Sequence, residues 1–487
     1  MESSGDRQSH RPPCRCRRET PMSSPSKPTR LLAAAAVALT MSACVSAPAP
    51  ASADATPTTG NTTGNTAGNT TGNTAVAAPE IPDTPVGRQL TWLLDAVGRA
   101  PLPESELTAH FAADFLASVP AAQLNEVLVQ FAGMRLEQLQ VQQNALVARV
   151  TAAGTPFTVQ MTVDGAGLIS GLLFQPVLPP PAIPTSWDEI DDRLAKTAPR
   201  TGFLAAELTA NGKCLPVHAV AAGKAQPLGS MIKLYVLGAV AKAVKTGAFD
   251  WDTQLTITPE LKSLPSGRLQ DRPDGSKVTV LEAAKLMISI SDNTATDLLI
   301  HKVGRKAVER TMRAWGAHDK RNVPALTTRE LFVLKGAGYP RHAERYLSMG
   351  DAKQRAYLKD VVAKVPVSQV APWAAPRELD TIEWFASPSQ ICRAYAGLVK
   401  SGDPRVHEAM SINDAGLDLD EKAWPRVWFK GGSEPGLSDL SFLARTAAGK
   451  SYVVTMMAVD HDKPVPQQVT LEQLALAKGA FGLAADS

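Results

Sequence analysis

A cluster of five prolines between residues 176 and 184 divides this chain into two parts with different patterns. Proline fixes φ and has no backbone N–H to donate, so the cluster cannot lie inside a helix or a central strand. The chain of 487 residues also exceeds the usual size of one hydrophobic core. We therefore expect two folded domains, one over residues 82–181 and one over residues 182–487.

The residues before position 82 carry the features of a leader. Lys27 and Arg30 precede an apolar segment over residues 31–43. This segment is too short to span a bilayer core of about 30 Å and is typical of a cleaved secretion signal. It ends in the sequence MSAC, which resembles a bacterial lipobox, in which the cysteine, here Cys44, becomes lipidated and forms the new N-terminus. An ordinary signal followed by an incidental cysteine is the alternative.

Residues 1–44 are thus predicted to be a leader with a lipoprotein signal, and residues 45–81 a disordered tether. The tether consists of Ala, Pro, Thr, Gly and Asn, including GNTTGNTAGNTTGNTA, and offers no apolar face to bury. These features predict a protein that is exported and anchored by lipid to the outer face of the bacterial cytoplasmic membrane.

The pattern of residues 82–181 changes from helical to extended. Apolar residues recur with helical spacing in residues 90–97, 111–116 and 124–131. Residues 134–175 then read as four strands separated by turn residues, which indicates an antiparallel meander. Helices followed by a sheet make a small α+β domain.

Residues 182–487 place strands at both ends and helices between them. A helix is expected near residues 186–195, followed by two strands around the Asn211-Gly212 turn. Three more strands, RVWFK, LSFLART and SYVVTMMAV, precede a final helix near residues 468–481. This order predicts an antiparallel sheet flanked by helices, which is again an α+β architecture.

Charge and cysteine content exclude several classes of function. The chain has 50 Lys and Arg against 47 Asp and Glu, and its formal net charge of +3 is too small for a nucleic-acid-binding surface. The five cysteines show no CxxC pair, zinc spacing or dense disulfide framework. His218 and His301 show neither metal nor triad spacing. We therefore expect no nucleic-acid partner, no metal and no cofactor.

Three short motifs follow one another along the second domain. The first, SMIK, opens an apolar helix, so its Ser230 and Lys233 should lie on one face within a single turn. A serine at a helix N-terminus also has exposed backbone N–H groups beside it that suit an oxyanion. Alone, S-x-x-K is weak evidence, because about two chance matches are expected in a chain of this length. Specificity comes from SDN at residues 291–293 and KGG at residues 430–432, which follow in order.

The order S-x-x-K, S-D-N and K-(T/S)-G resembles the signature of serine β-lactamases and penicillin-binding proteins. The segment SGRLQDRPDGSKVTVLEAAKLMISISDNTATDLLI is similar to the corresponding helical stretch of class A β-lactamases. The resemblance covers most of residues 186–315 and resumes over residues 425–460. Together with the small first domain, the sequence KGGS also resembles the two-domain β-lactamase-like proteins of clavulanic acid gene clusters and mycobacterial lipoproteins. That resemblance implies a cystatin-like or steroid-isomerase-like first domain.

The family resemblance implies catalytic roles for the first two motifs. Ser230 would attack a carbonyl carbon, and Lys233, when neutral, would accept the serine proton. Ser291 would pass a proton to the leaving group. Asn293 would bind the amide side chain of the substrate and hold Lys233.

The third motif is implied to bind and polarise the substrate. Lys430 would act at the site by attracting a substrate carboxylate. Gly432 and Ser433 would be substrate-binding residues. The backbone N–H groups of Ser230 and Ser433 would form the oxyanion hole. Gly431 departs from the family pattern, which usually has Thr or Ser at this position.

A second departure concerns the release of the acyl group. Class A enzymes carry an E-x-x-L-N loop whose Glu activates the deacylating water, and residues 313–332 contain no such motif. Glu330 is the nearest acid, in what reads as the next helix. Without a placed base, an acyl-enzyme would form and persist. A charged helical stretch at residues 340–380 reads as an insertion that reshapes the cleft.

The sequence thus predicts a serine hydrolase that forms an acyl-serine intermediate on an ester or amide, with a β-lactam among the candidate substrates. One alternative is a peptidoglycan D,D-peptidase or penicillin-binding protein acting on a cell-wall peptide. Another is a lipoprotein that binds ligands and has weak catalysis. In the first domain His110, Asp114 and Asp164 form no recognisable pair, which leaves that domain a binding or positioning role.

Overall fold

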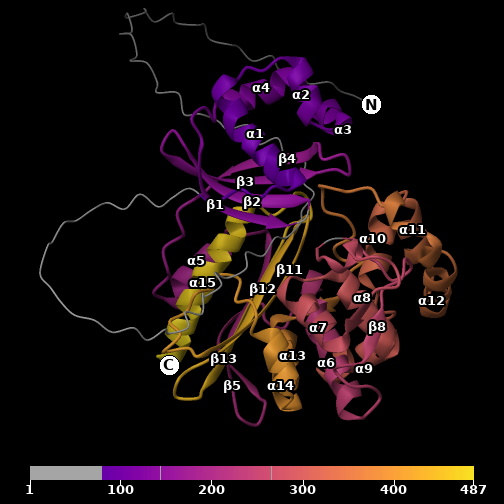
Figure 1. Cartoon of the computed structure of the whole chain (residues 1–487). Coiled ribbons are helices and arrows are strands. Elements are labelled where there is room, and N and C mark those ends of the chain that lie inside the picture. The colour runs from indigo at the N-terminus through magenta and orange to yellow at the C-terminus, as the bar shows by residue number, and fades with distance from the viewer. Residues whose placement is uncertain (1–78, 143, 265, 487) are drawn as a thin grey trace, which may run out of the picture. The chain divides into compact units, whose positions relative to one another are not determined.

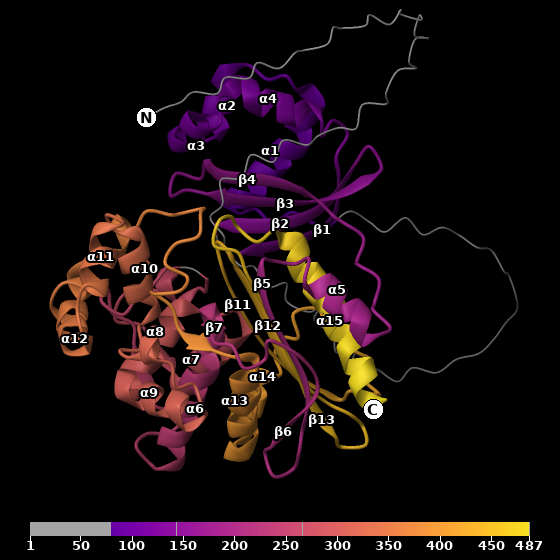
Figure 2. The same ribbon diagram turned by 180° about the vertical axis from the view of Figure 1, so that it is seen from behind.

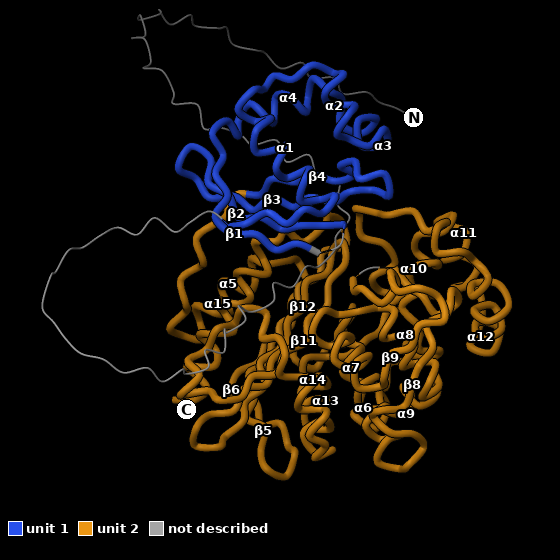
Figure 3. The backbone as a smooth tube through the Cα atoms, viewed as in Figure 1, with its two compact units in different colours: residues 1–38, 79–175 blue, residues 39–78, 176–487 orange. Residues whose placement is uncertain are grey.

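The computed structural model describes residues 79–142, 144–264 and 266–486. The described residues form two compact units that meet in the sequence at Gln175 and Pro176 (Figure 3). This junction lies at the start of the proline cluster, six residues before the predicted boundary at 181. The predicted leader with Cys44, and the tether up to residue 78, lie outside the described residues.

Unit 1 consists of short helices followed by a sheet (Figure 1). Its elements are α1 (Pro85–Arg99), α2 (Glu104–His110), α3 (Ala113–Ser118), α4 (Ala121–Val129), β1 (Arg135–Gln142), β2 (Ala145–Ala152), β3 (Thr155–Val163) and β4 (Ile169–Pro176). The strands lie in the order β1-β2-β3-β4, and β1–β2 and β2–β3 pair antiparallel. The helical spacing of Leu90, Leu93 and Val97 places all three on the face of α1 that is buried in the core of this unit.

Unit 2 is built around a larger antiparallel sheet. Its strands are β5 (Arg200–Leu208), β6 (Cys214–Val220), β7 (Gln226–Pro227), β8 (Gln254–Thr256), β9 (Lys277–Thr279), β10 (Phe385–Ala386), β11 (Arg426–Glu434), β12 (Leu437–Arg445) and β13 (Ser451–Val459). Its α-helices are α5 (Trp187–Leu194), α6 (Lys233–Lys245), α7 (Val280–Ser289), α8 (Asn293–Val303), α9 (Arg305–Ala314), α10 (Thr328–Gly336), α11 (Arg341–Leu347), α12 (Asp351–Asp360), α13 (Pro388–Ser401), α14 (Pro404–Met410) and α15 (Gln467–Ala485). Five strands pair antiparallel in the order β11-β12-β13-β5-β6.

Helices cover both faces of this five-stranded sheet (Figures 1 and 2). α5 and α15 lie together on one face, whereas α13 packs on the other face and is itself packed against α6. Neighbouring side chains of a strand point to opposite faces, so Phe203 and Leu204 of β5 belong to two different hydrophobic cores. The sheet therefore separates a two-helix layer from a larger helical layer.

The larger helical layer is centred on α6. Every residue from Lys233 to Ala241 is buried, as expected for a helix that is apolar on almost all sides. Lys233 is the first residue of this helix and has no exposed surface. Burial of α6 therefore fixes the position of the motif lysine.

A disulfide joins Cys214 on the edge strand β6 to Cys392 on α13, across 178 residues of sequence. The spacing of the cysteines gave no indication of this pair. The disulfide ties the edge of the sheet to the helix that covers it.

The fold class predicted from sequence, α+β with an antiparallel sheet flanked by helices, is confirmed. Two local predictions were inexact. Ser230 lies in a 3₁₀ turn, Gly229–Ile232, rather than in the α-helix, and β11 does not end at Lys430 but continues to Glu434. Among the described helices, none has the length and apolar character needed to cross a bilayer.

Candidate active site

The turn that carries Ser230 is held in place by β10. Gln226 and Pro227 pair with Ala386 and Phe385, and the amide of Leu228 then donates to the carbonyl of Trp384 at 2.8 Å. The 3₁₀ turn follows immediately and leads into α6. Ser230 is half-buried at the junction of the turn and α6.

The side chain of Lys233 connects the first two motifs. Its Nζ lies within hydrogen-bonding distance of Ser230 Oγ at 3.0 Å, Ser291 Oγ at 2.9 Å, the Ser291 carbonyl at 2.6 Å and Asn293 Oδ1 at 2.7 Å. None of these four oxygen atoms carries a charge. The distance between Ser230 Oγ and Lys233 Nζ falls within the range in which a base can take the proton of a nucleophile.

Ser291 adopts a backbone conformation that is uncommon outside glycine. Its φ is +58°, in the left-handed region. This conformation directs both the carbonyl and the hydroxyl of Ser291 to Lys233. Such backbone conformations persist where the surroundings hold them, and they gather at functional sites.

The surroundings of Ser291 explain how its conformation is held. Ser266 Oγ donates to the Ser291 carbonyl at 2.9 Å. Asp292 caps α8 by accepting from the amide of Ala295 at 2.8 Å, and its other oxygen accepts from the amides of Arg268 and Leu269. Sequence reasoning gave no role to these contacts, although Ser266 begins the stretch that resembles class A enzymes.

Asn293 is oriented by two contacts of its own amide group. Its Nδ2 donates to the carbonyl of Leu264 at 3.1 Å, which leaves Oδ1 directed at Lys233. Its backbone amide donates to the carbonyl of Ser266 at 2.9 Å. The side chain of Asn293 therefore holds Lys233, as the resemblance implied.

Lys430 reaches the same hydroxyl from the sheet. Its Nζ donates to Ser291 Oγ at 3.2 Å and to the Gly431 carbonyl at 2.7 Å. Lys430 is 2 % exposed and pairs with Ser441 of β12, whose hydroxyl donates to the Lys430 carbonyl at 2.6 Å. The structure thus brings Ser230, Lys233, Ser291 and Lys430 together at one site.

Glycine at position 432 permits the strand and the serine turn to approach each other. A Cβ added to Gly432 would lie 2.0 Å from the Leu228 carbonyl oxygen and 2.9 Å from the Ser230 amide nitrogen. A Cβ added to Gly229 would lie 3.0 Å from the amide nitrogen of Ser433. The amides of Ser230 and Ser433 therefore belong to two segments in direct contact, as an oxyanion hole requires.

Gly431 also occupies a crowded position. A Cβ there would lie 2.9 Å from the ring of Phe429 and 3.0 Å from the Asp439 carbonyl oxygen. This crowding gives a physical reason for glycine where the family usually has Thr or Ser. Ser433, two residues later, is exposed on β11.

The carboxylate of Glu330, the acid considered for deacylation, accepts hydrogen bonds from residues outside the Ser230 site. It is 7 % exposed at the start of α10, where one carboxylate oxygen accepts from Arg305 at 2.6 Å and the other accepts from the Thr327 amide at 2.8 Å. The Thr327 side chain in turn caps the Glu330 amide. These contacts make Glu330 a helix-capping residue.

Two of the three polar residues considered in unit 1, His110 and Asp164, have structural contacts. The ring of His110 stacks on that of Trp92 with centroids 3.9 Å apart, and its Nδ1 lies 2.9 Å from Gln89 Oε1. Asp164 accepts from the amides of its own turn. These contacts leave the role of unit 1 as a prediction.

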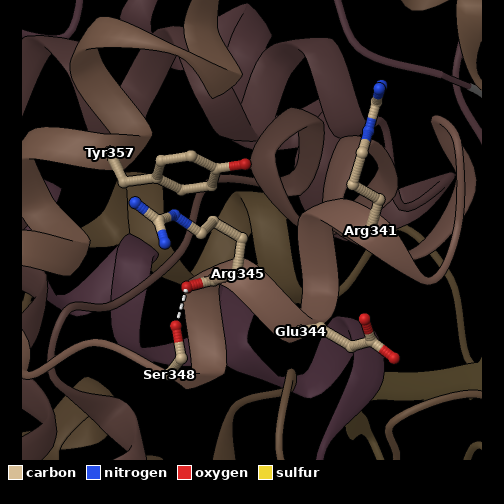
Figure 4. Close-up of a pocket in the computed structure, with 5 residues that line it drawn as sticks. All are labelled: Arg341, Glu344, Arg345, Ser348 and Tyr357. Carbon is tan, nitrogen blue, oxygen red and sulfur yellow. Dashed lines mark hydrogen bonds between the residues drawn. The ribbon is translucent and has the colours of Figure 1, made fainter.

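A hollow of about 560 Å³ on α11 and α12 contains none of the motif residues. It is lined by Arg341, Glu344, Arg345, Ser348 and Tyr357 (Figure 4). Within the described part of the chain, no three His, Cys, Asp or Glu side chains come together in a way that could hold a metal ion. Neither finding adds a residue to the Ser230 site.

Two family models match parts of the chain. Residues 185–353 match the model of the "Beta-lactamase enzyme family", and residues 81–169 match that of the "ORF 12 gene product N-terminal". No curated protein matches the chain in sequence.

Solved structures similar to the chain include β-lactamases and a penicillin-binding protein. A β-lactamase from Sphaerobacter thermophilus is 18% identical, with 62% of this chain and 98% of that chain covered and a TM-score of 0.43. A class A β-lactamase from Mycobacterium abscessus is 16% identical (61% and 98% covered, TM-score 0.40). The protein PBP-A is 19% identical (63% and 100% covered, TM-score 0.37).

The family match to residues 185–353 contains two of the three motifs, and the strand that carries the third pairs within the same unit. The second unit thus carries a domain that matches the β-lactamase enzyme family over residues 185–353.

Proposed function

We propose that the chain is an exported, lipid-anchored serine hydrolase that forms an acyl-serine intermediate with an ester or amide, with a β-lactam among its substrates. One observation carries the proposal: Lys233 Nζ contacts Ser230 Oγ at 3.0 Å and Ser291 Oγ at 2.9 Å. A single amine therefore contacts both the nucleophile and the group that would pass a proton to the departing atom.

Acylation would begin with Lys233 in its neutral form. The Ser230 proton moves to Lys233 Nζ as Ser230 Oγ bonds to the carbonyl carbon of the substrate. The bond from that carbon to the leaving nitrogen or oxygen then breaks, and the proton passes from Lys233 through the Ser291 hydroxyl to the leaving atom. General acid–base catalysis of this kind contributes about 10²–10⁴-fold to rate.

Charge that develops on the carbonyl oxygen would be stabilised by the backbone. The amides of Ser230 and Ser433 lie on the two segments that Gly229 and Gly432 bring into contact. Removing one oxyanion-hole donor typically costs about 3 kcal/mol in transition-state stabilisation. Lys430, which is nine-tenths buried beside Ser291, supplies a cation for a substrate carboxylate.

The engagement of Glu330 favours a second candidate, a penicillin-binding protein or D,D-peptidase acting on cell-wall peptides. With its carboxylate bound to Arg305 and Thr327, Glu330 does not provide a base for the deacylating water. An acyl-enzyme that forms without such a base persists, which is the behaviour of a penicillin-binding protein.

Export and lipid anchoring rest on the MSAC sequence and gain support from the disulfide. Disulfides persist in oxidising compartments outside the cytoplasm, and Cys214 is bonded to Cys392. Cys44→Ala should release the protein from membranes into the soluble fraction. Unchanged partitioning of the variant into the detergent phase would count against lipidation at Cys44.

Labelling with two reagents tests the enzymatic proposal. The wild-type protein and Ser230→Ala are incubated with a fluorescent penicillin and with a fluorophosphonate, and the intact mass is followed with time. Rapid turnover of penicillin indicates a β-lactamase, a stable penicillin adduct indicates a penicillin-binding protein, and phosphonate labelling with ester hydrolysis alone indicates an esterase. If neither reagent labels the protein, the enzymatic proposal is wrong, and the alternative that remains is a lipoprotein that binds ligands.

A further inference from the structure

Three charged side chains outside the motifs form a buried cluster in unit 2. Lys335 of α10 has no exposed side-chain surface, Glu383 lies just before β10 with 1% exposed, and Glu434 ends β11 with 11% exposed. Lys335 Nζ donates to Glu434 Oε1 at 2.7 Å and to Glu383 Oε1 at 3.4 Å. We call these three residues the Lys335 cluster.

The Lys335 cluster is joined to the chain on each side of the proposed oxyanion hole, by a hydrogen bond on one side and by sequence adjacency on the other. Glu383 Oε2 accepts from the amide of Gly229 at 3.2 Å, and Gly229 directly precedes Ser230. The same oxygen accepts from the Trp384 amide at 3.1 Å. Glu434 directly follows Ser433 on β11. Lys335 therefore links, through two carboxyl groups, the segments that carry the two amides.

These two segments pack closely at Gly229. Gly229 has a φ of +47°, and a Cβ on it would lie 3.0 Å from the Ser433 amide nitrogen. Oxyanion donors act over a narrow range of about 2.7–3.1 Å. A displacement of about 1 Å in a catalytic group can lower a rate by about 100-fold.

Burial and neighbouring charges shift the pKa values of the acidic groups in and beside the Lys335 cluster, and the shifts favour a small net charge. Burial raises the pKa of the Glu434 carboxyl well above its usual range; the Lys335 cation opposes this shift, and the nearby Glu383 carboxylate adds to it. Asp439, which pairs with Gly432 across the strands, also has a pKa raised by burial, with Glu383 raising it further and Arg200 opposing. From the side of the insertion, Arg377 donates to the Lys335 carbonyl at 2.7 Å.

Stability alone does not account for such a cluster. A buried ion pair costs desolvation, and apolar residues of similar size are often as stabilising. The contacts with the Gly229 amide and with the strand after Ser433 give the cluster a geometric role that apolar residues would not supply.

Resting on the proposed acyl-serine chemistry, we propose that Lys335, Glu383 and Glu434 are positioning residues that hold the Ser230 and Ser433 amides at the separation that binds an oxyanion. Helix α10 leads into the insertion, and Arg377 within it holds the Lys335 carbonyl. The segment predicted to be an insertion thereby supports the oxyanion hole.

The test uses two variants of the full-length protein. Glu383→Met keeps the side-chain length and removes both carboxylate oxygens, so that the amides of Gly229 and Trp384 lose their acceptor. The double variant Lys335→Met/Glu434→Gln removes the cation and the charge of its closest partner together, so that no unpaired lysine is buried. Acylation by the fluorescent penicillin or the fluorophosphonate, whichever labels wild-type Ser230, is measured against reagent concentration to separate binding from the acylation step.

We expect both variants to lower the limiting acylation rate at least tenfold while the apparent binding constant changes less than about threefold, because the chemical step alone uses the oxyanion hole. Glu309→Gln is the matched control. Glu309 is a mostly buried acid that binds Arg355 and the Ala325 amide, neither of which belongs to the site. Its acylation rate should stay within twofold of wild type.

Three results would overturn the inference. If both variants acylate at the wild-type rate while Ser230→Ala is unlabelled, the positioning role is wrong and the proposed function stands. If Glu309→Gln slows acylation equally, the effect is a general loss of stability. If wild-type Ser230 is labelled by neither reagent, the proposed function and the positioning role both fall.

Discussion

The Ser291 hydroxyl lies 2.9 Å from Lys233 Nζ and faces it from a backbone with a φ of +58°. The same hydroxyl lies 3.2 Å from Lys430 Nζ, so one oxygen atom connects the two lysines of the site. Substitutions at Ser291 can distinguish the effect of the strained backbone from the effect of the hydroxyl.

Ser291→Gly and Ser291→Ala should both lower the acylation rate, by about 10²-fold or more, because each removes the proton relay. Ser291→Gly should nevertheless be the more stable variant by about 1 kcal/mol, because glycine adopts a positive φ without the steric cost of a Cβ. Labelling rates and urea unfolding of the two variants check both parts. An acylation rate of Ser291→Ala equal to that of the wild type would show that the Ser291 hydroxyl takes no part in the reaction.

Gly432→Ala should abolish acylation. The new Cβ would lie 2.0 Å from the Leu228 carbonyl oxygen, so the strand or the serine turn must move and the two amides separate. Gly223→Ala is the control, because a Cβ at Gly223 meets nothing within 4 Å. Labelling is measured together with the melting temperature. Normal labelling of the Gly432 variant would show that the two segments are not held as tightly as described.

Asp297 should make stability fall as pH rises. Its carboxyl, 2 % exposed, accepts from the amides of Thr328 and Arg329, and burial raises its pKa to about 6. The folded state therefore holds the proton more tightly than the unfolded state. The contribution of the protonated Asp297 carboxyl to the free energy of unfolding is fully present below about pH 4. It is lost as pH rises through about 6, which lowers the free energy of unfolding by about 3 kcal/mol.

The comparison with Asp297→Asn isolates this contribution. The asparagine variant carries a constant penalty, because its NH₂ group faces an amide donor, but it has no proton to lose. The difference in unfolding free energy, wild type minus variant, should decline between pH 4 and pH 7. A difference that does not change with pH would contradict the raised pKa.

Removal of the disulfide should affect stability far more than activity. The double variant Cys214→Ala/Cys392→Ala should have a free energy of unfolding that is lower by about 2–5 kcal/mol, because the disulfide closes a loop of 178 residues in the unfolded chain. Both cysteines lie outside the set of residues that contact Ser230, so the acylation rate should change less than about threefold. Urea unfolding and labelling measure the two effects. Equal stability of the variant and the oxidised protein would contradict the pairing.

Much of the site could be predicted because its motifs are short and local. Ser230 and Lys233 are one turn apart, and the order of the three motifs placed Ser291 and Lys430 with them before any contact was known. The strands and end helices of unit 2 were predictable for a similar reason, since alternation and helical spacing are local patterns.

The remaining features depend on long-range contacts. Lys335 and Glu434 are 99 residues apart, and Cys214 and Cys392 are 178 apart, so no local pattern links either pair. The extension of β11 beyond Lys430 to Glu434 depends on its pairing with β12, which the local sequence does not reveal. Ser266 was within the stretch that resembled class A enzymes, but its contact with the Ser291 carbonyl required the folded chain.

The most direct test of the account is to locate the covalent adduct. Wild-type protein is treated with penicillin or fluorophosphonate, digested, and analysed by mass spectrometry, with Ser230→Ala treated in parallel. We predict an added acyl or phosphonyl group on Ser230 in the wild type and none in the variant. A wild-type protein that carries no adduct with either reagent, or an adduct on another residue that persists in Ser230→Ala, would contradict the assignment of Ser230 as the nucleophile.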